Sequence, residues 1–146
     1  MTHEDTFVKT TCPVARAVDL LGDRWVLMIL RDAFDGLRRF SDFQKSTGVA
    51  KNLLAVRLKW LVEAGIFTQV PVNEGAAYHA YALTPKGKSL FPLILSLRQW
   101  GEEHLFRDGE PMSRLVDAEQ QPVAKLVVTN ASGKKLEPED IQRLQP

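Results

Sequence analysis

The sequence predicts an α+β fold in which helices come first, a β-hairpin follows, and a long helix closes the folded part of the chain. Apolar residues recur with the spacing of amphipathic helices from residue 13 to residue 64. Residues 66–83 are instead rich in β-branched and aromatic side chains around a turn, and helical spacing returns after residue 85. These two changes of period favour a helical domain interrupted by one hairpin.

The first two helices are predicted over residues 13–21 and 24–34. Pro13 suits the first helical position, where a missing N–H costs nothing, and Gly22 suits the position just after the helix. Asp23 is the expected N-cap of the second helix, because its carboxylate accepts hydrogen bonds from N–H groups of the first turn. The centre of the second helix is almost wholly apolar, which indicates burial on most sides.

A short helix, a glycine-containing turn and a longer helix follow in series. Ser41 is the predicted N-cap of the short helix, over residues 42–46, and Thr47-Gly48 breaks the chain. The longer helix is predicted over residues 50–64, and its apolar side chains form one stripe: Leu54, Leu58, Leu61 and Val62. This order is that of a helix-turn-helix.

A β-hairpin and one more helix complete the pattern. Residues 66–72 and 78–83 are the predicted strands, joined by the turn Asn73-Glu74-Gly75-Ala76. Thr84-Pro85 restarts a helix of about five turns, which Pro92 is expected to kink. Its apolar stripe consists of Leu90, Leu93, Ile94, Leu97, Trp100 and Leu105. The predicted fold is therefore a winged helix-turn-helix with a long C-terminal dimerisation helix.

The chain is expected to divide into a winged helix-turn-helix DNA-binding and dimerisation domain over residues 1–108 and a small β-rich C-terminal extension over residues 109–146. Within the extension, Leu115-Val116 and residues 123–128 are predicted as short strands, and residues 138–144 as two helical turns. Such an extension is too short to fold alone without covalent or metal staples.

The composition is that of an ordinary globular protein, with 45% hydrophobic and 25% charged residues. The longest apolar run, Val26 to Leu30, is far shorter than the ~20 residues that span a bilayer, so no membrane span is expected. The first ten residues are polar and include acids, which is not a signal-peptide pattern. The single cysteine, Cys12, cannot form an internal disulfide or a zinc site, which favours a cytoplasmic protein without a metal.

Charge is unevenly distributed along the chain, although the net charge is only +1. Residues 36–60 carry six cations against one acid, a balance of +5, whereas residues 101–120 carry two cations against six acids, a balance of −4. A basic segment in a near-neutral protein is typical of a surface that contacts DNA phosphates, and it is also compatible with an ordinary solvated face.

Several blocks of sequence carry a family resemblance: Cys12-Pro13-Val14, Leu20 to Trp25, Ile29 to Asp32, Arg39-Phe40-Ser41, Leu58 to Gly65, Tyr81 to Gly87 and Leu97 to Gly101. In this order they resemble the HxlR family of bacterial, MarR-like transcriptional regulators, over roughly residues 10–105. The resemblance implies a homodimer that binds paired operator half-sites on double-stranded DNA. Several members of the family respond to reactive electrophiles or oxidants.

The chain departs from the family pattern at three places. Ala50-Lys51 stands where the family has a Ser-Pro pair, and alanine caps a helix less well than serine by ~1 kcal/mol. The wing segment Gly75-Ala76-Ala77-Tyr78-His79 lacks an arginine that many members carry before the second strand. The segment 129–133 lacks the cysteines of a Cys-x-x-Cys-Gly pattern found in the extension of some relatives, so no zinc is expected.

Candidate base-reading residues lie on the second helix of the helix-turn-helix, because that helix enters the major groove. With the leucines turned inward, its opposite face at ~100° per residue carries Asn52, Ala55, Val56 and Lys59. An asparagine pairs with adenine, and Ala55 and Val56 suit a thymine methyl group. Lys59, further along the helix, suits a phosphate.

Further cations flank this face. Lys51 and Arg57 lie at its sides, although Arg57 can instead pair with an acid such as Asp32. Phosphate contacts are expected from Arg38, from Arg39 and from the helix start capped by Ser41, where free N–H groups favour an anion. Alternatively, Arg39 is only a solvent-exposed side chain of its loop. His79, on the wing, completes the candidate DNA-binding set.

Cys12 is a candidate redox sensor. It precedes Pro13 and therefore lies at a helix N-terminus, where N–H groups and the helix dipole favour a thiolate. The family resemblance implies that the cysteine of this motif can act as a sensor thiol. The alternative is that Cys12 is a small buried hydrophobic residue without reactivity.

The expected function is therefore sequence-specific DNA binding that regulates transcription, as a repressor and a homodimer. A second hypothesis is a sensor in which Cys12 or a small-molecule effector bound by the extension controls DNA release. A third is a protein-interaction module, against which the basic segment argues. No glycine-rich phosphate loop, nucleophile-and-base set or paired carboxylates stand out, so neither an enzyme nor a cofactor is expected.

Overall fold

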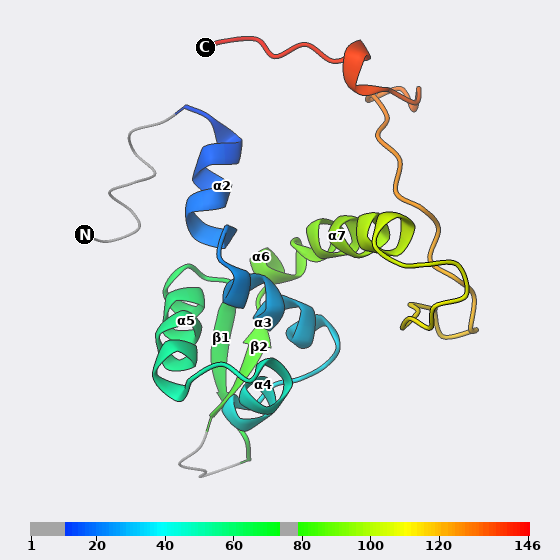
Figure 1. The fold of residues 1–146 in the computed structure, drawn as a ribbon. Coiled ribbons are helices and arrows are strands. Elements are labelled where there is room, and N and C mark those ends of the chain that lie inside the picture. The colour runs from blue at the N-terminus through cyan, green and yellow to red at the C-terminus, as the bar shows by residue number, and fades with distance from the viewer. Residues whose placement is uncertain (1–10, 74–78) are drawn as a thin grey trace. The chain divides into compact units, whose positions relative to one another are not determined.

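The structure is a computed structural model that describes residues 11–73 and 79–146. The chain forms two compact units, Met1–Ile94 and Leu95–Pro146 (Figure 1). The first unit contains the winged helix-turn-helix, and the second contains the end of the last long helix and the residues after it.

The first unit has the element order that the sequence predicts. Its helices and strands are α2 (Pro13–Leu21), α3 (Arg24–Phe34), α4 (Phe40–Thr47), α5 (Lys51–Glu63), β1 (Phe67–Pro71), β2 (His79–Leu83) and α6 (Pro85–Lys88). Helix α7 (Phe91–His104) begins in this unit, and a 3-10 turn, η1 (Pro138–Asp140), lies near the end of the chain. The fold is the predicted α+β winged helix-turn-helix (Figure 1).

The caps of α2 and α3 confirm the predicted helix starts. Pro13 is at the start of α2, and the N-cap Cys12 accepts a hydrogen bond from the N–H of Ala15 at its sulfur. Asp23 caps α3 by accepting from the N–H groups of Trp25 and Val26. Gly22 follows the end of α2 with a negative φ of −77°. The position therefore does not require the left-handed conformation that glycine adopts readily. A Cβ there would lie 2.6 Å from the carbonyl oxygen of Val18, which explains the glycine sterically.

The predicted cap of α4 is wrong. The helix begins at Phe40 with Arg39 as its N-cap, so Ser41 lies inside the first turn and does not cap it. The carboxylate of Asp42 accepts from the backbone N–H of the N-cap residue, Arg39, at 3.3 Å. A residue three positions into a helix can reach back to the cap in this way. The helix starts two residues earlier than predicted.

The core of the first unit is one cluster of apolar side chains from α2, α3, α4, α5 and β1. Its fully buried members come from α3, α4, α5 and the start of the hairpin: Val26, Ile29, Leu30, Phe43, Leu54, Leu58, Leu61, Ile66 and Phe67. Half-buried residues that pack around it include Tyr81 and Leu83 of the hairpin and Ile94 of α7. The predicted inward orientation of the α5 leucines is confirmed.

The hairpin is antiparallel, with Phe67 opposite Leu83 and Pro71 opposite His79. Thr84 fastens its base, because its hydroxyl donates to the backbone carbonyls of Gly65 and Ile66 and accepts from the N–H of Gly87. Most of the predicted turn and the wing residues 74–78 lie outside the described residues.

The predicted kinked helix from Pro85 is instead two helices, α6 and α7, separated at Ser89 and Leu90. Pro92 lies in the first turn of α7, where its missing N–H breaks no helical hydrogen bond. In the middle of one continuous helix the same ring would clash with the carbonyl of Lys88, four residues earlier. The chain therefore restarts a helix where a kink was expected.

Residues 109–146, here called the C-terminal arm, are nearly all exposed. In place of the predicted short strands the arm has two isolated antiparallel bridges, Val116↔Pro122 and Thr129↔Lys135. In place of two helical turns it has the single 3-10 turn η1. The strands do not extend because no second apolar layer lies against them in this unit, and β-propensity needs such packing.

Among the residues that the structure describes, no helix is both long and apolar enough to cross a membrane.

Candidate nucleic-acid interface

The turn between α4 and α5 sets the angle of the helix-turn-helix. Gly48 ends α4 in the left-handed region, with φ of +71°, a conformation that a residue with a Cβ adopts at a cost. Thr47 closes the last turn by donating to the carbonyl of Phe43, and its oxygen accepts from the N–H of Val49. Val49, buried in the core, then anchors the start of α5. The turn is therefore stabilised by the hydrogen bonds of Thr47 and by the packing of Val49 in the core.

Helix α5 presents two different faces. Leu54, Leu58 and Leu61 are fully buried, whereas the opposite face is exposed and carries Lys51, Asn52, Ala55, Val56 and Lys59. Val56 exposes 55% of its surface, which is high for an apolar side chain on a helix packed into a domain. The exposed face combines an amide, two small apolar groups and two ammonium groups, which is the chemistry that reads base edges and phosphates in a major groove.

The start of α5 offers free donors. Its N-cap, Ala50, makes no side-chain hydrogen bond to the first turn, as expected for an alanine in this position. Lys51 and Asn52 are exposed in that first turn. The N-terminal end of α5 therefore joins backbone N–H groups with an exposed cation.

Arg57 is not available in the same way as the other cations of α5. Its Nη2 and Nε lie 3.0 and 3.1 Å from Oδ2 of Asp23, and its guanidinium also lies over the ring of Trp60. Burial raises the pKa of Asp23, but the hydrogen bond and charge of Arg57 and the N–H groups of Val26 and Trp25 outweigh it and lower the pKa overall. Sequence analysis offered an ion pair with an acid such as Asp32 as the alternative role of Arg57. The ion pair is present, but its partner is Asp23 and the prediction of Asp32 is wrong.

Asp32 pairs instead with the adjacent Arg31. The Arg31 guanidinium donates to Oδ1 of Asp32 at 2.8 Å and to the hydroxyl of Ser46 at 3.1 Å, so it connects α3 to the end of α4. Asp32 is only 2% exposed, and its Oδ2 has no hydrogen-bond partner among the described residues. Sequence reasoning missed this connection. The sequence feature that could have revealed it is the adjacent charged pair Arg31-Asp32 within the mostly apolar helix α3.

The loop before α4 brings two more cations beside the wing. Arg38 and Arg39 are exposed, and the backbone carbonyl of Arg38 accepts from the N–H of Tyr81 on β2 at 2.7 Å. The loop is therefore fastened to the second wing strand. His79 begins that strand and is exposed opposite Pro71. Ser41 is exposed in the first turn of α4.

The cations of the loop and of α5, together with His79 of the wing strand, thus all belong to the first unit and to elements that pack on one core. Helix α5 packs against α3, α4 and β1. Asn52, Ala55, Val56 and Lys59 share one exposed face, and Arg38, Arg39 and His79 flank the hairpin. Arg57, also predicted to contact DNA, is engaged in an ion pair with Asp23 inside the unit.

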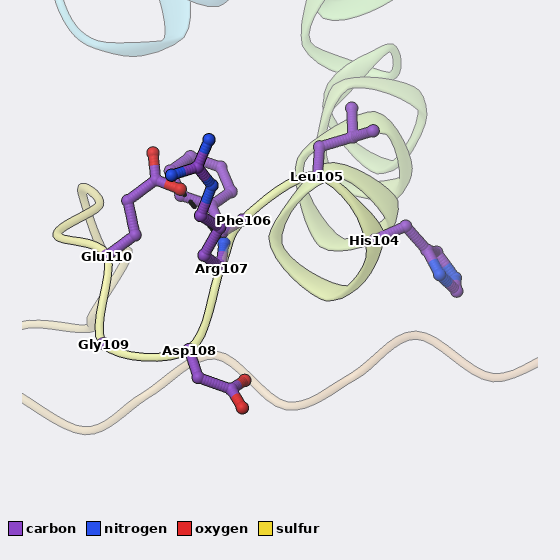
Figure 2. A pocket seen from close by; sticks show the side chains of 7 residues that line it. All are labelled: His104, Leu105, Phe106, Arg107, Asp108, Gly109 and Glu110. Carbon is purple, nitrogen blue, oxygen red and sulfur yellow. Dashed lines mark hydrogen bonds between the residues drawn. The ribbon is translucent and has the colours of Figure 1, made fainter.

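The described residues form two hollows, one in each unit. The larger, of about 930 Å³, is formed by His104 to Glu110, where the chain leaves α7 (Figure 2). Nearly all of its side chains are exposed, and the loop is closed by the N–H of Arg107 donating to Glu110 at 3.0 Å. The smaller, of about 220 Å³, lies between Leu37, Arg38, Leu83 and Lys88, below the ~300–1,000 Å³ usual for ligand pockets. Neither is an enclosed apolar cavity with converging polar groups.

This fold and this exposed helix face define a winged helix-turn-helix DNA-binding protein. The chain belongs to the HxlR-like helix-turn-helix family, whose model matches residues 20–108. A helix-turn-helix transcriptional regulator of Mycobacterium tuberculosis, Rv3095, is 44% identical over 102 residues, which is 70% of this chain and 65% of that protein. This chain therefore covers less than two thirds of that relative's own length. YdeP of Bacillus subtilis, another such regulator, is 30% identical over 64% of this chain and 73% of its own.

Solved structures agree with the fold. The crystal structure of PA1607, a proposed transcription factor, is 47% identical, with a TM-score of 0.88 over 94% of this chain and 97% of its own. That coverage includes most of the C-terminal arm. The redox regulator HypR is 26% identical, with a TM-score of 0.59 over 64% of this chain and 94% of its own. The homologues are transcriptional regulators, which is a non-enzymatic role.

Proposed function

We propose that this protein is a sequence-specific DNA-binding repressor that acts as a homodimer in the cytoplasm. The observation that carries the proposal is the exposed face of α5, where Asn52, Ala55 and Val56 lie free of the core and Lys59 follows them. A helix-turn-helix places this helix in the major groove with its N-terminal residues against the base edges. The +5 balance of residues 36–60 supports the same surface.

Each residue of the face has a chemical role in this proposal. The amide of Asn52 pairs with adenine through two hydrogen bonds, and Ala55 and Val56 pack against a thymine methyl group. Lys51, Lys59, Arg38 and Arg39 neutralise phosphates and set the register without reading sequence. Arg57 contributes to the position of α5 through Asp23 more than to DNA contact.

Homodimerisation is supported by uncovered apolar side chains. Leu93, Leu97 and Trp100 follow one face of α7 at helical spacing and expose 40%, 50% and 59% of their surface. Val14 and Val18 of α2 are also exposed, at 69% and 56%. Large exposed apolar groups on a folded chain mark an interface. A two-fold dimer would place two α5 helices on half-sites about one helical turn apart, ~34–36 Å.

The decisive experiment selects binding sites from random or genomic DNA and measures affinity across a salt series. We expect a two-fold symmetric site whose affinity falls steeply as salt rises, because bound lysines and arginines release condensed counterions. The variant K51E/K59E reverses the charge at two exposed positions outside the core and should weaken binding to all DNA. The proposal fails if no sequence outcompetes bulk DNA at moderate salt.

A second function, redox control of DNA binding through Cys12, is favoured by one observation. The Cys12 sulfur is 3.4 Å from the N–H of Ala15 at the start of α2, so a change of this sulfur acts directly on a helix cap. HypR and YodB, both similar to this chain, have structures in different oxidation states. The test compares operator affinity of the wild type and Cys12→Ser before and after mild oxidant. Serine keeps an oxygen acceptor at the cap, so equal oxidant responses of the two proteins would exclude the role.

A further inference from the structure

Residues 124–129 of the C-terminal arm form no ladder with another strand, and their backbone groups are hydrogen-bonded on one edge only. In an extended chain, the N–H and C=O groups of alternate residues point to opposite edges. The even-numbered edge is occupied: Gln99 donates to the carbonyl of Ala124 at 3.0 Å and accepts from the N–H of Leu126 at 2.8 Å. The carbonyl of Val128 accepts from the N–H of Leu136 at 2.9 Å.

The odd-numbered edge is covered only at its start. The N–H of Val123 donates to the carbonyl of Leu115 at 3.4 Å, through the turn that ends in the Val116↔Pro122 bridge. Beyond it, the backbone groups of Lys125, Val127 and Thr129 have no hydrogen-bond partner in the part of the chain that the structure describes. These three residues form an open edge three alternate residues long.

The side chains around the open edge are the kind that a paired strand buries. Val127 and Val128 expose 59% and 58% of their surface, although β-branched residues favour packed strands. An exposed, flat, apolar strand edge is a site for pairing with another strand unless something covers it. The strand is also held in place, because Glu103 of α7 binds Lys125 at 3.0 Å beside the two contacts of Gln99.

We propose that this open edge pairs with the same edge of a second copy of this chain. The two strands run antiparallel around a two-fold axis at Val127, so that Val127 faces Val127 and Lys125 faces Thr129 of the other copy. This register uses all three open residues. A register centred on Lys125 would set two lysines directly opposite each other, which destabilises a sheet. A two-fold axis makes such an interface complementary to itself.

The arm also supplies enough surface for a stable contact. Interfaces of stable complexes use about 20–30 residues on each side. The arm has exposed apolar side chains before and after residues 129–140, namely Met112, Val116, Val123, Leu126, Val127, Val128, Ile141 and Leu144. The pairing goes beyond the helix-mediated dimer proposed above, because it assigns the partner of a segment that the family match over residues 20–108 does not include.

The test places one cysteine on the edge in a Cys12→Ser background. In the proposed register the two Cα atoms of residue 127 are ~5.5 Å apart, within the 4.4–6.8 Å that a disulfide spans. Val127→Cys should therefore cross-link two chains under mild oxidation at least about tenfold faster than its control. The control is Val123→Cys, on the same strand and also exposed, whose two copies would be ~26 Å apart.

Both positions are exposed, so neither substitution threatens the core, and circular dichroism checks this. Equal cross-linking of the two variants, or faster cross-linking of Val123→Cys, overturns the proposal. Hydrogen exchange of the unmodified protein is the second measurement: the N–H groups of Lys125 and Val127 should be protected at high concentration and exposed on dilution. Fast exchange at every concentration overturns it, and protection without cross-linking shows that another strand covers the edge and also overturns it. DNA binding is measured separately, so loss of operator binding with intact cross-linking would contradict the proposed function alone.

Discussion

Arg57 of α5 binds Asp23 at the start of α3, with both contacts made to one carboxylate oxygen at 3.0 and 3.1 Å. The other oxygen accepts the N–H groups of Trp25 and Val26 and caps α3. One aspartate therefore serves as a helix cap and as the anchor of the helix that faces DNA. Its loss should loosen two elements together.

We expect Asp23→Ala to lower the free energy of unfolding by about 1–2 kcal/mol, because the N-cap is lost and Arg57 is left without its carboxylate. Urea denaturation of the wild type and the variant measures this. Asp35→Ala is the matched control, since Asp35 is exposed at the other end of α3. An equal loss of unfolding free energy in both variants would mean that the cap and the ion pair of Asp23 do not stabilise the fold more than an exposed aspartate does.

The contribution of Asp23 should depend on pH. The pKa of Asp23 in the folded chain lies below its ordinary value of 3.8, so the folded state favours the charged carboxylate. The stabilisation is then fully present above pH 3.8 and is lost as pH falls through the lower folded pKa. The stability difference between the wild type and Asp23→Asn should therefore shrink in that acidic range. A difference that grows on acidification would reverse the assigned sign.

Substitutions of Asn52 and Lys59 should weaken DNA binding in different ways. Asn52→Ala should relax the preference for one base and cost ~1–3 kcal/mol of binding at that position. Lys59→Ala should weaken all sequences about equally and reduce the slope of affinity against salt by about one per contact. Binding assays with single-base operator variants over a salt series separate the two. Equal, sequence-independent losses would show that α5 is rotated differently on DNA.

Two glycines should respond oppositely to alanine. A Cβ at Gly87 would lie 2.2 Å from the carbonyl oxygen of Ile66 and 3.0 Å from Leu83, so Gly87→Ala should destabilise the unit by about 1–3 kcal/mol. Gly101, inside α7, has open space at the same position, so Gly101→Ala should stabilise the helix by up to about 1 kcal/mol. Thermal and urea unfolding of the two variants test this pair. Similar effects of both would contradict the close approach of α6 to Ile66.

The apolar face of α7 should control assembly. Trp100→Glu places a charge on a side chain that is 59% exposed in the single chain, so the fold should survive while dimerisation weakens. Light scattering at low micromolar concentration should give a dimer for the wild type and a shift towards 16.4 kDa for the variant. A wild-type mass of 16.4 kDa would end the homodimer proposal.

The local signals in the sequence predicted most of the fold. Period changes placed the helices and the hairpin, Asp23 was predicted as a cap, and the leucine stripe of α5 is buried as expected. These features depend on residues within one or two turns of each other, and the physics of caps and amphipathic faces is local. The start of α4 at Phe40 was missed by two residues, because the bond from the Arg39 N–H to Asp42 begins the helix before Ser41.

Only the tertiary structure decided which distant groups meet. Arg57 and Asp23 are 34 residues apart, and no spacing rule could choose Asp23 over Asp32 as the partner. The same holds for Gln99, which satisfies one edge of the arm and leaves the other open at Lys125 and Val127. Sequence patterns determine which surfaces are apolar or charged, because that follows from composition and period. Which of those surfaces find partners depends on the packing of the whole core, because backbone and ionic groups pair only where the fold brings them within hydrogen-bond distance.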